Sequence, residues 1–432
     1  MNRFKALVLS VCMVFLLSTT AQGATLGPAA DYAQLLELTA QAADGDVILI
    51  AGEIVADEQI PLSTQAAVTL TSADDSPATI RGLRLDDAQI TATGIRFEDS
   101  LSIRGTSYVE LGSGVSVQGA SGKSGLSFDG NGSLILYPEC SVSGGEGGEG
   151  MTINHRGGDF YAGIEGTISG GSGQAGGSGL TISRLSDTGA LMISGTISGG
   201  NGRTHGGQAL NLYDLSGNAF ITVTGTLYGG DGAVGGDGIQ VVATDGNASV
   251  GIFGTVTGGK GQSYGGDALI LMNMNGASSV SLSGSLTGGD VTESGAKPGT
   301  SLLVVGSGSA SRTRVGDCHL LDGTDLSALN AKPSPLPTAE PGVTPLPEIT
   351  SSVEDSEALT TPTPMPIPDE TAEPTQAPDA GSAPVPEATA EPTPSPETSP
   401  TPDVIAEPTP SPTPTPEPAV LAADSPVPTD IS

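Results

Sequence analysis

Short apolar runs recur along most of the chain, and between residues 46 and 326 they are separated by Gly, Asn, Asp and Ser. Within a run, apolar and polar positions alternate, as where Thr222 and Thr224 flank Val223. This period of two predicts β-strands, because successive side chains of a strand point to opposite faces of the sheet. We therefore expect many short strands, each with one buried and one exposed face.

One short phrase returns five times in the middle of the chain, as Gly-Thr-Ile-Ser-Gly-Gly or a close variant. The copies begin at Gly166, Gly195, Gly225, Gly254 and Gly284. Their Gly-Gly pairs recur at two alternating spacings that differ by a single residue, and all of this variation lies in the segment directly after each pair. A repeat of this size predicts one supersecondary unit stacked on copies of itself. The variable segment is predicted to be a loop on the surface of a rigid scaffold.

When the repeats are aligned, equivalent positions form apolar columns. Two columns lie two residues apart: Leu126, Met151, Leu180, Leu210, Ile239, Leu269 and Leu302, and Phe128, Ile153, Ile182, Leu212, Val241, Leu271 and Val304. Two more are Ile164, Ile193, Val223, Ile252 and Leu282, and Ile168, Ile197, Leu227, Val256 and Leu286. Such columns predict an all-β solenoid, a parallel β-helix, in which each strand pairs with its equivalent in the next coil. A sandwich or propeller, the rival fold, would need hairpin turns.

The segment before the first strands is predicted to be a helix. Tyr32, Leu35, Leu36 and Ala43 have helical spacing, and Asp31 is placed to cap the helix N-terminus. A short amphipathic helix at this point would cover the open end of the solenoid, which otherwise exposes an unpaired edge.

The N-terminus has the pattern of a secretory signal. Arg3 and Lys5 precede an apolar stretch over residues 6–17, and small residues up to Gly23 precede a cleavage point before Ala24. An uncleaved anchor is the alternative, although the stretch is shorter than the roughly 20 residues that span a bilayer. The mature protein is predicted to be secreted or associated with the cell surface, without a transmembrane segment.

The composition changes abruptly after about residue 330. Residues 331–432 hold 27 of the 32 prolines, and 17 acidic residues accompany a single basic one, Lys332. Such sequence favours solvated polyproline II over a packed core, so we expect a disordered acidic stalk. The predicted organisation is a signal peptide over 1–23, a cap helix over 24–45, β-helix coils of about 29 residues over 46–330, clearest over 140–290, and the stalk over 331–432.

The net charge of -33 limits the partners. It excludes a general nucleic-acid-binding surface, which would need basic patches, and it disfavours anionic membranes. Cys140 and Cys318 lie about six repeats apart, much farther than a disulfide can reach at about 4.8 Å per coil, so both are predicted to be unpaired.

Several segments carry a resemblance to a known family. They are Leu35-Leu36-Glu37-Leu38, then Asp44-Gly45-Asp46-Val47-Ile48-Leu49, Ala78-Thr79-Ile80-Arg81-Gly82 and Thr93-Gly94-Ile95-Arg96-Phe97. In these the chain resembles the right-handed parallel β-helix proteins, the pectin-lyase-like superfamily, in the form found in exported bacterial surface proteins. The resemblance implies a right-handed solenoid. It does not settle activity, because the fold hosts lyases, hydrolases, adhesins and passive spacers.

Lyases of that family use clustered carboxylates for calcium and a basic residue as proton acceptor. The candidates here are Asp74, Asp75, Asp86, Asp87, Glu98 and Asp99, with Arg81, Arg84, Arg96 and Arg104. Coil register could bring Asp86 or Asp87 near Glu98 and Arg96. We favour solvated turn residues instead, and assign no catalytic residue.

No metal or cofactor site is predicted either. The three histidines are scattered without metal-ligand spacing. Asp237 and Asp267 lie one repeat apart, and a stacked Asp pair holding a cation remains an alternative. The glycine pattern over residues 171–176 leads into a strand rather than a helix, so it does not predict a dinucleotide site.

The remaining candidate site is the variable segment after each Gly-Gly pair, where larger polar side chains interrupt a glycine-rich ledge. They are Gln174, Asn201, Arg203, His205, Lys260, Gln262 and Tyr264. One such segment per coil suits an extended ligand, an extracellular polysaccharide or cell-wall glycan. The sequence thus favours a non-catalytic protein of adhesion or glycan contact; a polysaccharide lyase or glycoside hydrolase and a passive structural spacer are the alternatives.

Overall fold

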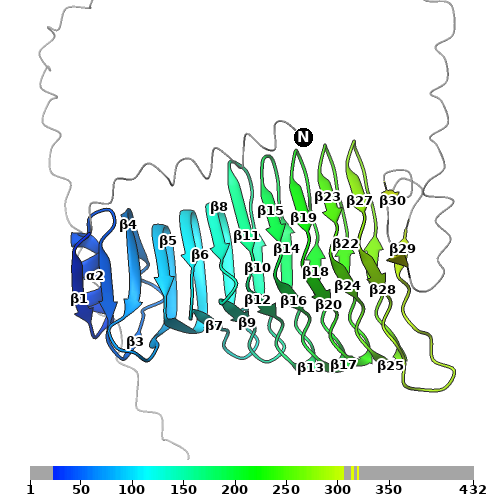
Figure 1. The fold of residues 1–432 in the computed structure, drawn as a ribbon, viewed down its shortest axis with the longest axis horizontal. Helices are drawn as coiled ribbons and strands as arrows, with labels where there is room; N and C mark the ends of the chain where they lie inside the picture. Colours follow the sequence, from blue (N-terminus) through cyan, green and yellow to red (C-terminus); the bar gives the residue numbers. More distant parts are fainter. Residues whose placement is uncertain (1–22, 306–312, 316–318, 321–432) are drawn as a thin grey trace, which may run out of the picture. The chain divides into compact units, whose positions relative to one another are not determined.

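The computed structural model describes residues 23–305, 313–315 and 319–320, which form a parallel β-solenoid whose coils stack along one axis (Figure 1). Every strand pairing among these residues is parallel. The predicted parallel β-solenoid is therefore confirmed, and the hairpins of a sandwich or propeller are absent from this part of the chain. The predicted signal peptide, stalk and Cys318 lie outside the described residues.

Three ladders of strands form the sides of the solenoid, and four long strands, β4, β5, β6 and β8, take part in more than one side. The first side contains β4 (Leu62–Ser72), β5 (Ala78–Thr93), β6 (Ile95–Leu111), β8 (Leu126–Leu136), β10 (Met151–Asn154), β14 (Leu180–Arg184), β18 (Leu210–Leu212), β22 (Ile239–Val241), β26 (Leu269–Leu271) and β29 (Leu302–Val304).

The second side begins nearer the N-terminus and includes the last parts of β4, β5, β6 and β8. Its other strands are β1 (Thr25–Ala29), β2 (Val47–Ile50), β11 (Phe160–Ile164), β15 (Ala190–Ile193), β19 (Phe220–Val223), β23 (Ser249–Ile252), β27 (Ser279–Leu282) and β30 (Thr313–Val315).

The third side consists of short strands together with the first parts of β5 and β6. They are β3 (Glu53–Val55), β7 (Ser116–Gln118), β9 (Ser141–Ser143), β12 (Thr167–Ser169), β16 (Thr196–Ser198), β20 (Thr226–Tyr228), β24 (Thr255–Thr257), β28 (Ser285–Thr287) and β31 (His319–Leu320).

The residues of each apolar column predicted from the repeats pair with one another in these ladders. Phe128 pairs with Ile153, Ile153 with Ile182, and the series continues coil by coil to Val304. The column from Ile168 to Leu286 and the column from Ile164 to Leu282 pair in the same way. Equivalent apolar residues therefore stack directly on one another inside the solenoid.

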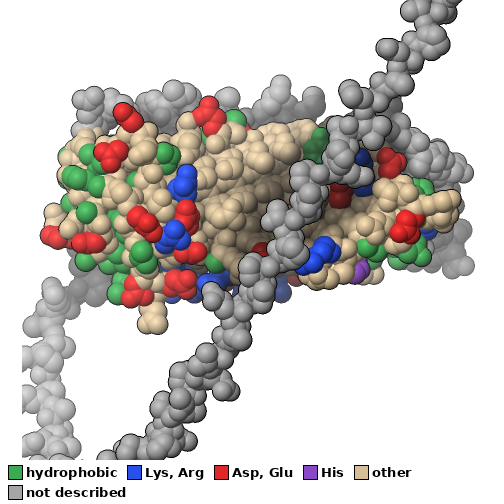
Figure 2. Space-filling model, turned by 90° about the horizontal axis from the view of Figure 1, so that it is seen from below, with side chains coloured by type: hydrophobic (Ala, Val, Ile, Leu, Met, Phe, Trp, Pro, Cys, Tyr) green, Lys and Arg blue, Asp and Glu red, His purple; other side chains and the backbone are tan. Residues whose placement is uncertain are grey.

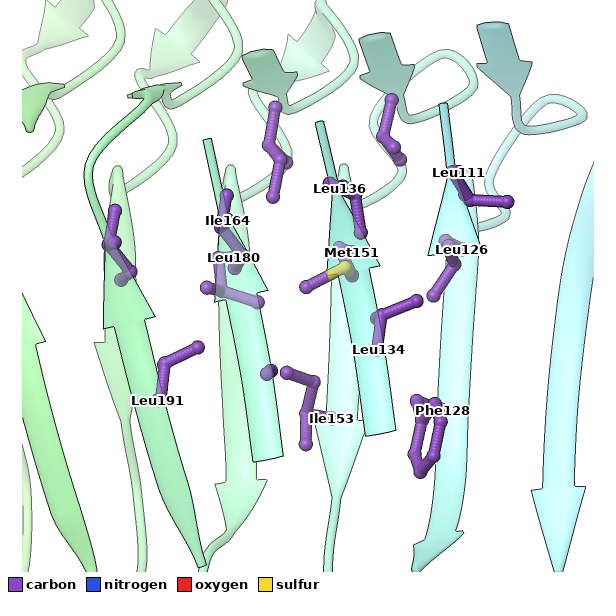
Figure 3. Packing of buried hydrophobic residues seen from close by; sticks show 14 of the residues in the cluster. Leu111, Leu126, Phe128, Leu134, Leu136, Met151, Ile153, Ile164, Leu180 and Leu191 are labelled. Atoms are coloured by element: carbon purple, nitrogen blue, oxygen red, sulfur yellow. The ribbon is translucent and has the colours of Figure 1, made fainter. Parts of the chain in front are cut away.

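These inward side chains form one continuous core. Figure 3 shows Leu, Ile, Met and Phe side chains of successive coils meeting between the sides. Met151 and Leu180 are fully buried, and the rings of Phe128 and Phe160 lie 5.0 Å apart between centroids. The core stays narrow because each coil contributes only a few aliphatic side chains, which fits a sequence with 3% aromatic residues.

The predicted cap helix is present as α2 (Tyr32–Gln41) and lies at the N-terminal end of the solenoid (Figure 1). The Asp31 side chain accepts a hydrogen bond from the Gln34 amide at 2.8 Å, so Asp31 is the N-cap. The helix buries Leu35 against the first coils. The predicted cap segment also contains β1, which pairs with β2. The sequence did not predict this strand, because only one of its five residues is buried and apolar and polar positions therefore do not alternate along it.

From Ile80 onward the coils lengthen along the chain. On the third side, the residues that pair in succession are Ile80, Phe97, Val117, Val142, Ile168 and Ile197. The interval between neighbours in this series grows at every step, as their residue numbers show. A single repeat length thus describes only the later coils, and the additional residues of those coils build the candidate site.

Candidate functional site

A second, small sheet lies along the later coils, in the segments after each Gly-Gly pair. Its strands are β13 (Gly173–Ala175), β17 (Gly202–His205), β21 (Gly232–Val234) and β25 (Gly261–Tyr264). Figure 1 shows β13, β17 and β25 in a row at the lower edge of the solenoid. The prediction of loops here was wrong, because excursions of nearly equal length stack at the coil spacing and can pair their backbones.

The register of this small sheet places one residue from each coil in a column: Ala175, His205, Val234 and Tyr264. The segments alternate in length by one residue. The register of the strand pairing shifts between Gly173 and Ala175 and between Gly232 and Val234, and these shifts accommodate the extra residue. The column is therefore continuous although the segments differ in length by one residue.

Each excursion leaves and re-enters the solenoid through a pair of glycines, which we call the glycine neck. In one coil the neck consists of Gly199-Gly200 and Gly206-Gly207. The Gly207 amide donates to the Gly200 carbonyl at 2.8 Å, and the Gly200 amide donates to the Gly177 carbonyl of the preceding coil at 2.8 Å. The same alternation of bonds continues from Gly145 to Gly299. A chain of backbone hydrogen bonds thus runs along the axis and fixes the small sheet to the solenoid.

The neck admits only glycine because backbones touch there. A Cβ on Gly207 would lie 1.9 Å from the Gly177 carbonyl oxygen, and a Cβ on Gly200 would lie 2.2 Å from the Gly171 carbonyl oxygen. The repeated Gly-Gly phrase is therefore required by this close approach. In the sequence it marked the boundary between the core strands and the small sheet.

A groove of about 330 Å³ lies between the small sheet and the first side of the solenoid. One wall is formed by His205, Val234 and Tyr264, which share a register column. The other wall is formed by the residues that precede the first-side strands: Gln208, Asp237 and Asp267. The remaining lining residues are Gly206, Gly235, Gly236, Gly265, Lys297 and Pro298. The glycine neck thus leaves the groove open between a wall of His205, Val234 and Tyr264 and a polar wall.

The two aspartates of the polar wall are linked through the backbone. Oδ1 of Asp237 accepts the Asp267 amide at 2.9 Å, and Oδ1 of Asp267 accepts the amide and the hydroxyl of Thr300 at 2.6 and 2.8 Å. Burial and the nearby Asp267 charge raise the pKa of Asp237 to about 6, against the lowering effect of the Asp267 amide. Each carboxylate is therefore fixed in position by the next coil.

Of the seven residues predicted for this ledge, His205 and Tyr264 line the groove. Gln174, Arg203 and Gln262 are exposed on the small sheet but do not line it. Asn201 and Lys260 precede their strands: Oδ1 of Asn201 accepts the Asp231 amide at 2.8 Å, and Oδ1 of Asp231 accepts the Lys260 amide at 2.7 Å. The structure therefore divides the predicted set into groove, exposed surface and ladder positions.

The sequence did not single out Gln208 and Lys297, and it considered Asp237 and Asp267 only as a cation pair. The sequence feature that Gln208, Asp237 and Asp267 share is their position: each directly follows the second Gly-Gly pair of its coil. No group of three or more His, Cys, Asp or Glu able to hold a metal occurs within the described residues.

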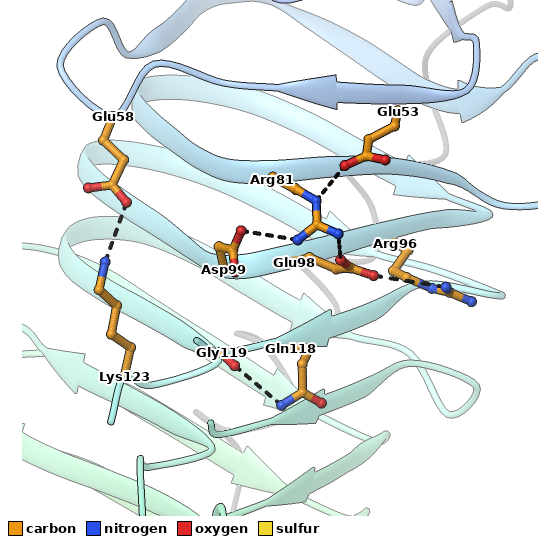
Figure 4. Close-up of polar contacts among 9 residues, drawn as sticks. All are labelled: Glu53, Glu58, Arg81, Arg96, Glu98, Asp99, Gln118, Gly119 and Lys123. Carbon is orange, nitrogen blue, oxygen red and sulfur yellow. Dashed lines mark hydrogen bonds and ion pairs between the residues drawn. The ribbon is translucent and has the colours of Figure 1, made fainter. Parts of the chain in front are cut away.

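The acidic and basic residues considered for catalysis lie at the opposite end, on the N-terminal coils. Arg81 contacts three carboxylates there: Glu53 at 2.5 Å, Glu98 at 2.5 Å and Asp99 at 3.3 Å (Figure 4). Hydrogen bonds to Glu53 and then Asp99 raise the pKa of Arg81. These three carboxylates therefore share one permanently charged guanidinium, and Asp99 also lines the neighbouring cavity.

Neither Asp86 nor Asp87 forms an ion pair or hydrogen bond with Glu98 or Arg96 in the part of the chain that the structure describes, so the predicted approach is not found. Glu98 and Arg96 form an ion pair at 3.9 Å, whereas Asp86 pairs with Arg84. Oδ1 of Asp87 accepts the Thr106 amide at 2.7 Å and so supports a turn. Arg84 and Arg104 line a cavity of about 400 Å³ together with Lys123, which pairs with Glu58 at 3.4 Å.

Figure 2 shows the contrast between the two ends from the side of the small sheet. Acidic and basic side chains gather over the N-terminal coils, and most of the neighbouring surface toward the later coils is uncharged. The uncharged surface thus lies between the N-terminal coils and a second group of acidic and basic side chains toward the later end of the described coils.

Two buried polar groups lie away from both regions. Cys140 is buried, and burial raises the pKa of its thiol to about 12, so the thiol is not activated. His155 is buried and stacks on Phe160 with ring centroids 5.4 Å apart, and burial lowers its pKa. Both side chains belong to the interior of the solenoid.

The chain matches no protein-family model, no curated protein and no solved structure. The fold places the protein among the parallel β-solenoids, and the groove beside the small sheet is a candidate for binding because its lining repeats from coil to coil.

Proposed function

We propose that the protein is a non-catalytic, exported β-solenoid that contacts extended glycans, acting in adhesion at a bacterial surface. The observation that carries the proposal is the groove beside the small sheet. Each of its two walls takes one residue from each of three successive coils. His205 and Tyr264 belong to one wall, and Gln208, Asp237 and Asp267 form the other. A small number of polar groups facing aromatic surface is the usual composition of a site for a small or extended ligand.

The N-terminal coils support the non-catalytic part of the proposal. Of the six carboxylates considered for a lyase, Glu98 and Asp99 contact Arg81 and Asp86 contacts Arg84, so three of them are engaged with guanidinium groups. A general acid or base instead needs a tuned, accessible carboxyl or basic group beside the substrate. A polysaccharide lyase or hydrolase of the pectin-lyase-like type remains the alternative that the experiment tests.

The sequence supports an extracellular location and partner. The signal-like residues 1–23 and the proline-rich acidic residues 331–432 are typical of an exported protein carried on a stalk. The net charge of -33 argues against nucleic acid as partner. No helix among the described residues is long and apolar enough to cross a membrane. Extracellular polysaccharide or cell-wall glycan is the partner that fits these features.

The test is incubation of the purified protein with a panel of polysaccharides, measuring retention of the protein and cleavage of the polymer in the same samples. The proposal predicts retention without new reducing or unsaturated ends. New ends formed in proportion to the protein would show an enzyme. Absence of retention on every polysaccharide would favour a passive spacer and would contradict the proposal.

A further inference from the structure

We infer that the groove takes an uncharged polysaccharide whose chain runs along the solenoid axis. In this arrangement Tyr264 contacts the sugar rings, and Asp237 and Asp267 accept hydrogen bonds from hydroxyl groups. The inference rests on the proposed function, and it adds the class of glycan, its direction in the groove and the residues that select it.

The direction follows from the register of the two walls. His205, Val234 and Tyr264 stand one above another at the coil spacing of about 4.8 Å, and Gln208, Asp237 and Asp267 do the same on the facing wall. A polymer lying parallel to the axis therefore meets the same pair of walls at each coil. The contacts of successive units then act together, as in multivalent binding.

The ligand chemistry follows from the difference between the walls. A pyranose ring has apolar C–H faces and a rim of hydroxyl groups. Tyr264 is 56% exposed, so its ring is available to pack against such a face. The facing carboxylates and the Gln208 amide supply acceptors for the hydroxyl rim. The wall with Tyr264 therefore suits the apolar face of a sugar ring, and the polar wall suits its hydroxyl groups.

The acceptors are held in place before any ligand arrives. Asp237 and Asp267 each use Oδ1 to accept a hydrogen bond from the next coil, and the structure gives the second oxygen of each no partner among the described residues. Because the ladder fixes both carboxyl groups, binding orders few side chains. Such preorganisation lowers the entropy lost on binding.

The same carboxylates select against acidic glycans. A uronate, sulfate or phosphate in the groove would lie beside Asp237 and Asp267 on a protein of net charge -33. Lys297 lines only the C-terminal end of the groove, in register with Tyr264. The two carboxylates would repel an anionic glycan. Repulsion of this kind is a common way for a binding site to discriminate against a molecule that resembles its ligand.

The experiment is affinity electrophoresis of the full chain in gels containing a soluble neutral glucan or its carboxymethyl derivative. The protein is expected to be retarded by the neutral polymer and bound at least about tenfold more weakly by the carboxymethyl form. Tyr264→Ala is expected to weaken binding of the neutral glucan about fivefold to tenfold, the range for loss of one aromatic contact. Tyr228→Ala is the matched control, since Tyr228 is 45% exposed on the third side, away from the groove.

A double variant tests the repulsion directly. Asp237→Asn with Asp267→Asn keeps the shape of both side chains and removes both charges, so it is expected to raise the affinity for the carboxymethyl polymer at least about fivefold. Equal losses in Tyr264→Ala and Tyr228→Ala, or tighter binding of the carboxymethyl form by the unmodified protein, would overturn the inference and leave glycan contact standing. No binding to any polysaccharide by the unmodified protein would overturn the proposed function itself.

Discussion

The N-terminal coils and the later coils share one core and differ in everything outside it. Up to Ile168 the coils are shorter and of unequal length, and their third side carries the ion pairs of Arg81. From Ile168 onward the coils are longer and nearly equal in length, and the same outward positions hold Thr or Ser in most coils. The longer coils carry the small sheet, and the glycine neck begins one coil earlier, at Gly145.

This difference shows where the additional residues of a repeat go. They do not enlarge the core, since the apolar columns continue through both regions without a break. They leave the solenoid between the third and first sides and form a second ladder, with a groove beside it. A solenoid can thus acquire a binding surface while its core remains unchanged.

The largest expected effect is the loss of stability when a glycine of the neck is replaced by alanine, compared with the same change at an ordinary glycine turn. In Gly207→Ala the new Cβ would lie 1.9 Å from the Gly177 carbonyl oxygen, and the neighbouring atoms are all backbone. We expect a loss of at least about 4 kcal/mol in the free energy of unfolding, measured by chemical denaturation and far-ultraviolet circular dichroism.

The control lies in the N-terminal region, at Gly122. Its φ is +73°, and a Cβ there would meet no atom within 4 Å. Gly122→Ala is therefore expected to lose only about 1 kcal/mol, from backbone strain alone. Similar losses in the two variants would contradict the close-packed neck.

A second prediction concerns the pH dependence of the groove. The pKa of Asp237 is about 6 in the folded protein, above the ordinary value of 3.8, because the group is buried beside Asp267. The folded state therefore binds more protons than the unfolded state between pH 4 and 6, and this carboxyl lowers stability as the pH rises through that window. Asp237→Asn removes the penalty and is expected to raise stability on the order of 3 kcal/mol at pH 7.5.

At pH 2.5 the carboxyl is protonated in both states, so the variant and the unmodified protein should unfold alike. Thermal unfolding at the two pH values measures the difference. A variant that is equally or less stable at pH 7.5 would show that Asp237 is not held in a charge-disfavouring position.

The smallest expected effect is at the ion pairs of the N-terminal coils. Arg81→Met removes contacts to Glu53, Glu98 and Asp99, but these groups are partly exposed and their attraction is weakened by solvent. We expect a small fall in the unfolding temperature at low salt that disappears at about 0.5 M salt. Ser198→Met, on the outward face of the third side in the later coils, should show no such salt dependence. A large, salt-independent loss in Arg81→Met would assign this arginine a structural role beyond charge pairing.

Much of this fold was predictable from the sequence, because the apolar columns determine strand register directly. Leu126 to Leu302 and Phe128 to Val304 pair as the aligned repeats require. The capping helix was predictable from Asp31 and the spacing of Tyr32 and Leu35. These features depend on local periodicity and burial, which single residues report.

The small sheet was not predictable in the same way. Its strands, such as Gly202–His205, bury no apolar side chain and are held by backbone bonds between coils, so no alternating pattern marks them. For the same reason the sequence identified His205 and Tyr264 but not the wall of Gln208, Asp237 and Asp267, which is formed only when coils stack. Long-range register created the groove, and no single repeat contains it.

The most direct test of the groove as the glycan site is backbone hydrogen exchange, measured by mass spectrometry with and without saturating neutral glucan. Slower exchange is predicted in peptides covering residues 203–208, 232–237 and 262–267, with no change in peptides covering residues 53–123. Protection confined to the N-terminal coils, or none in the three groove segments while the glucan is bound, would contradict this assignment.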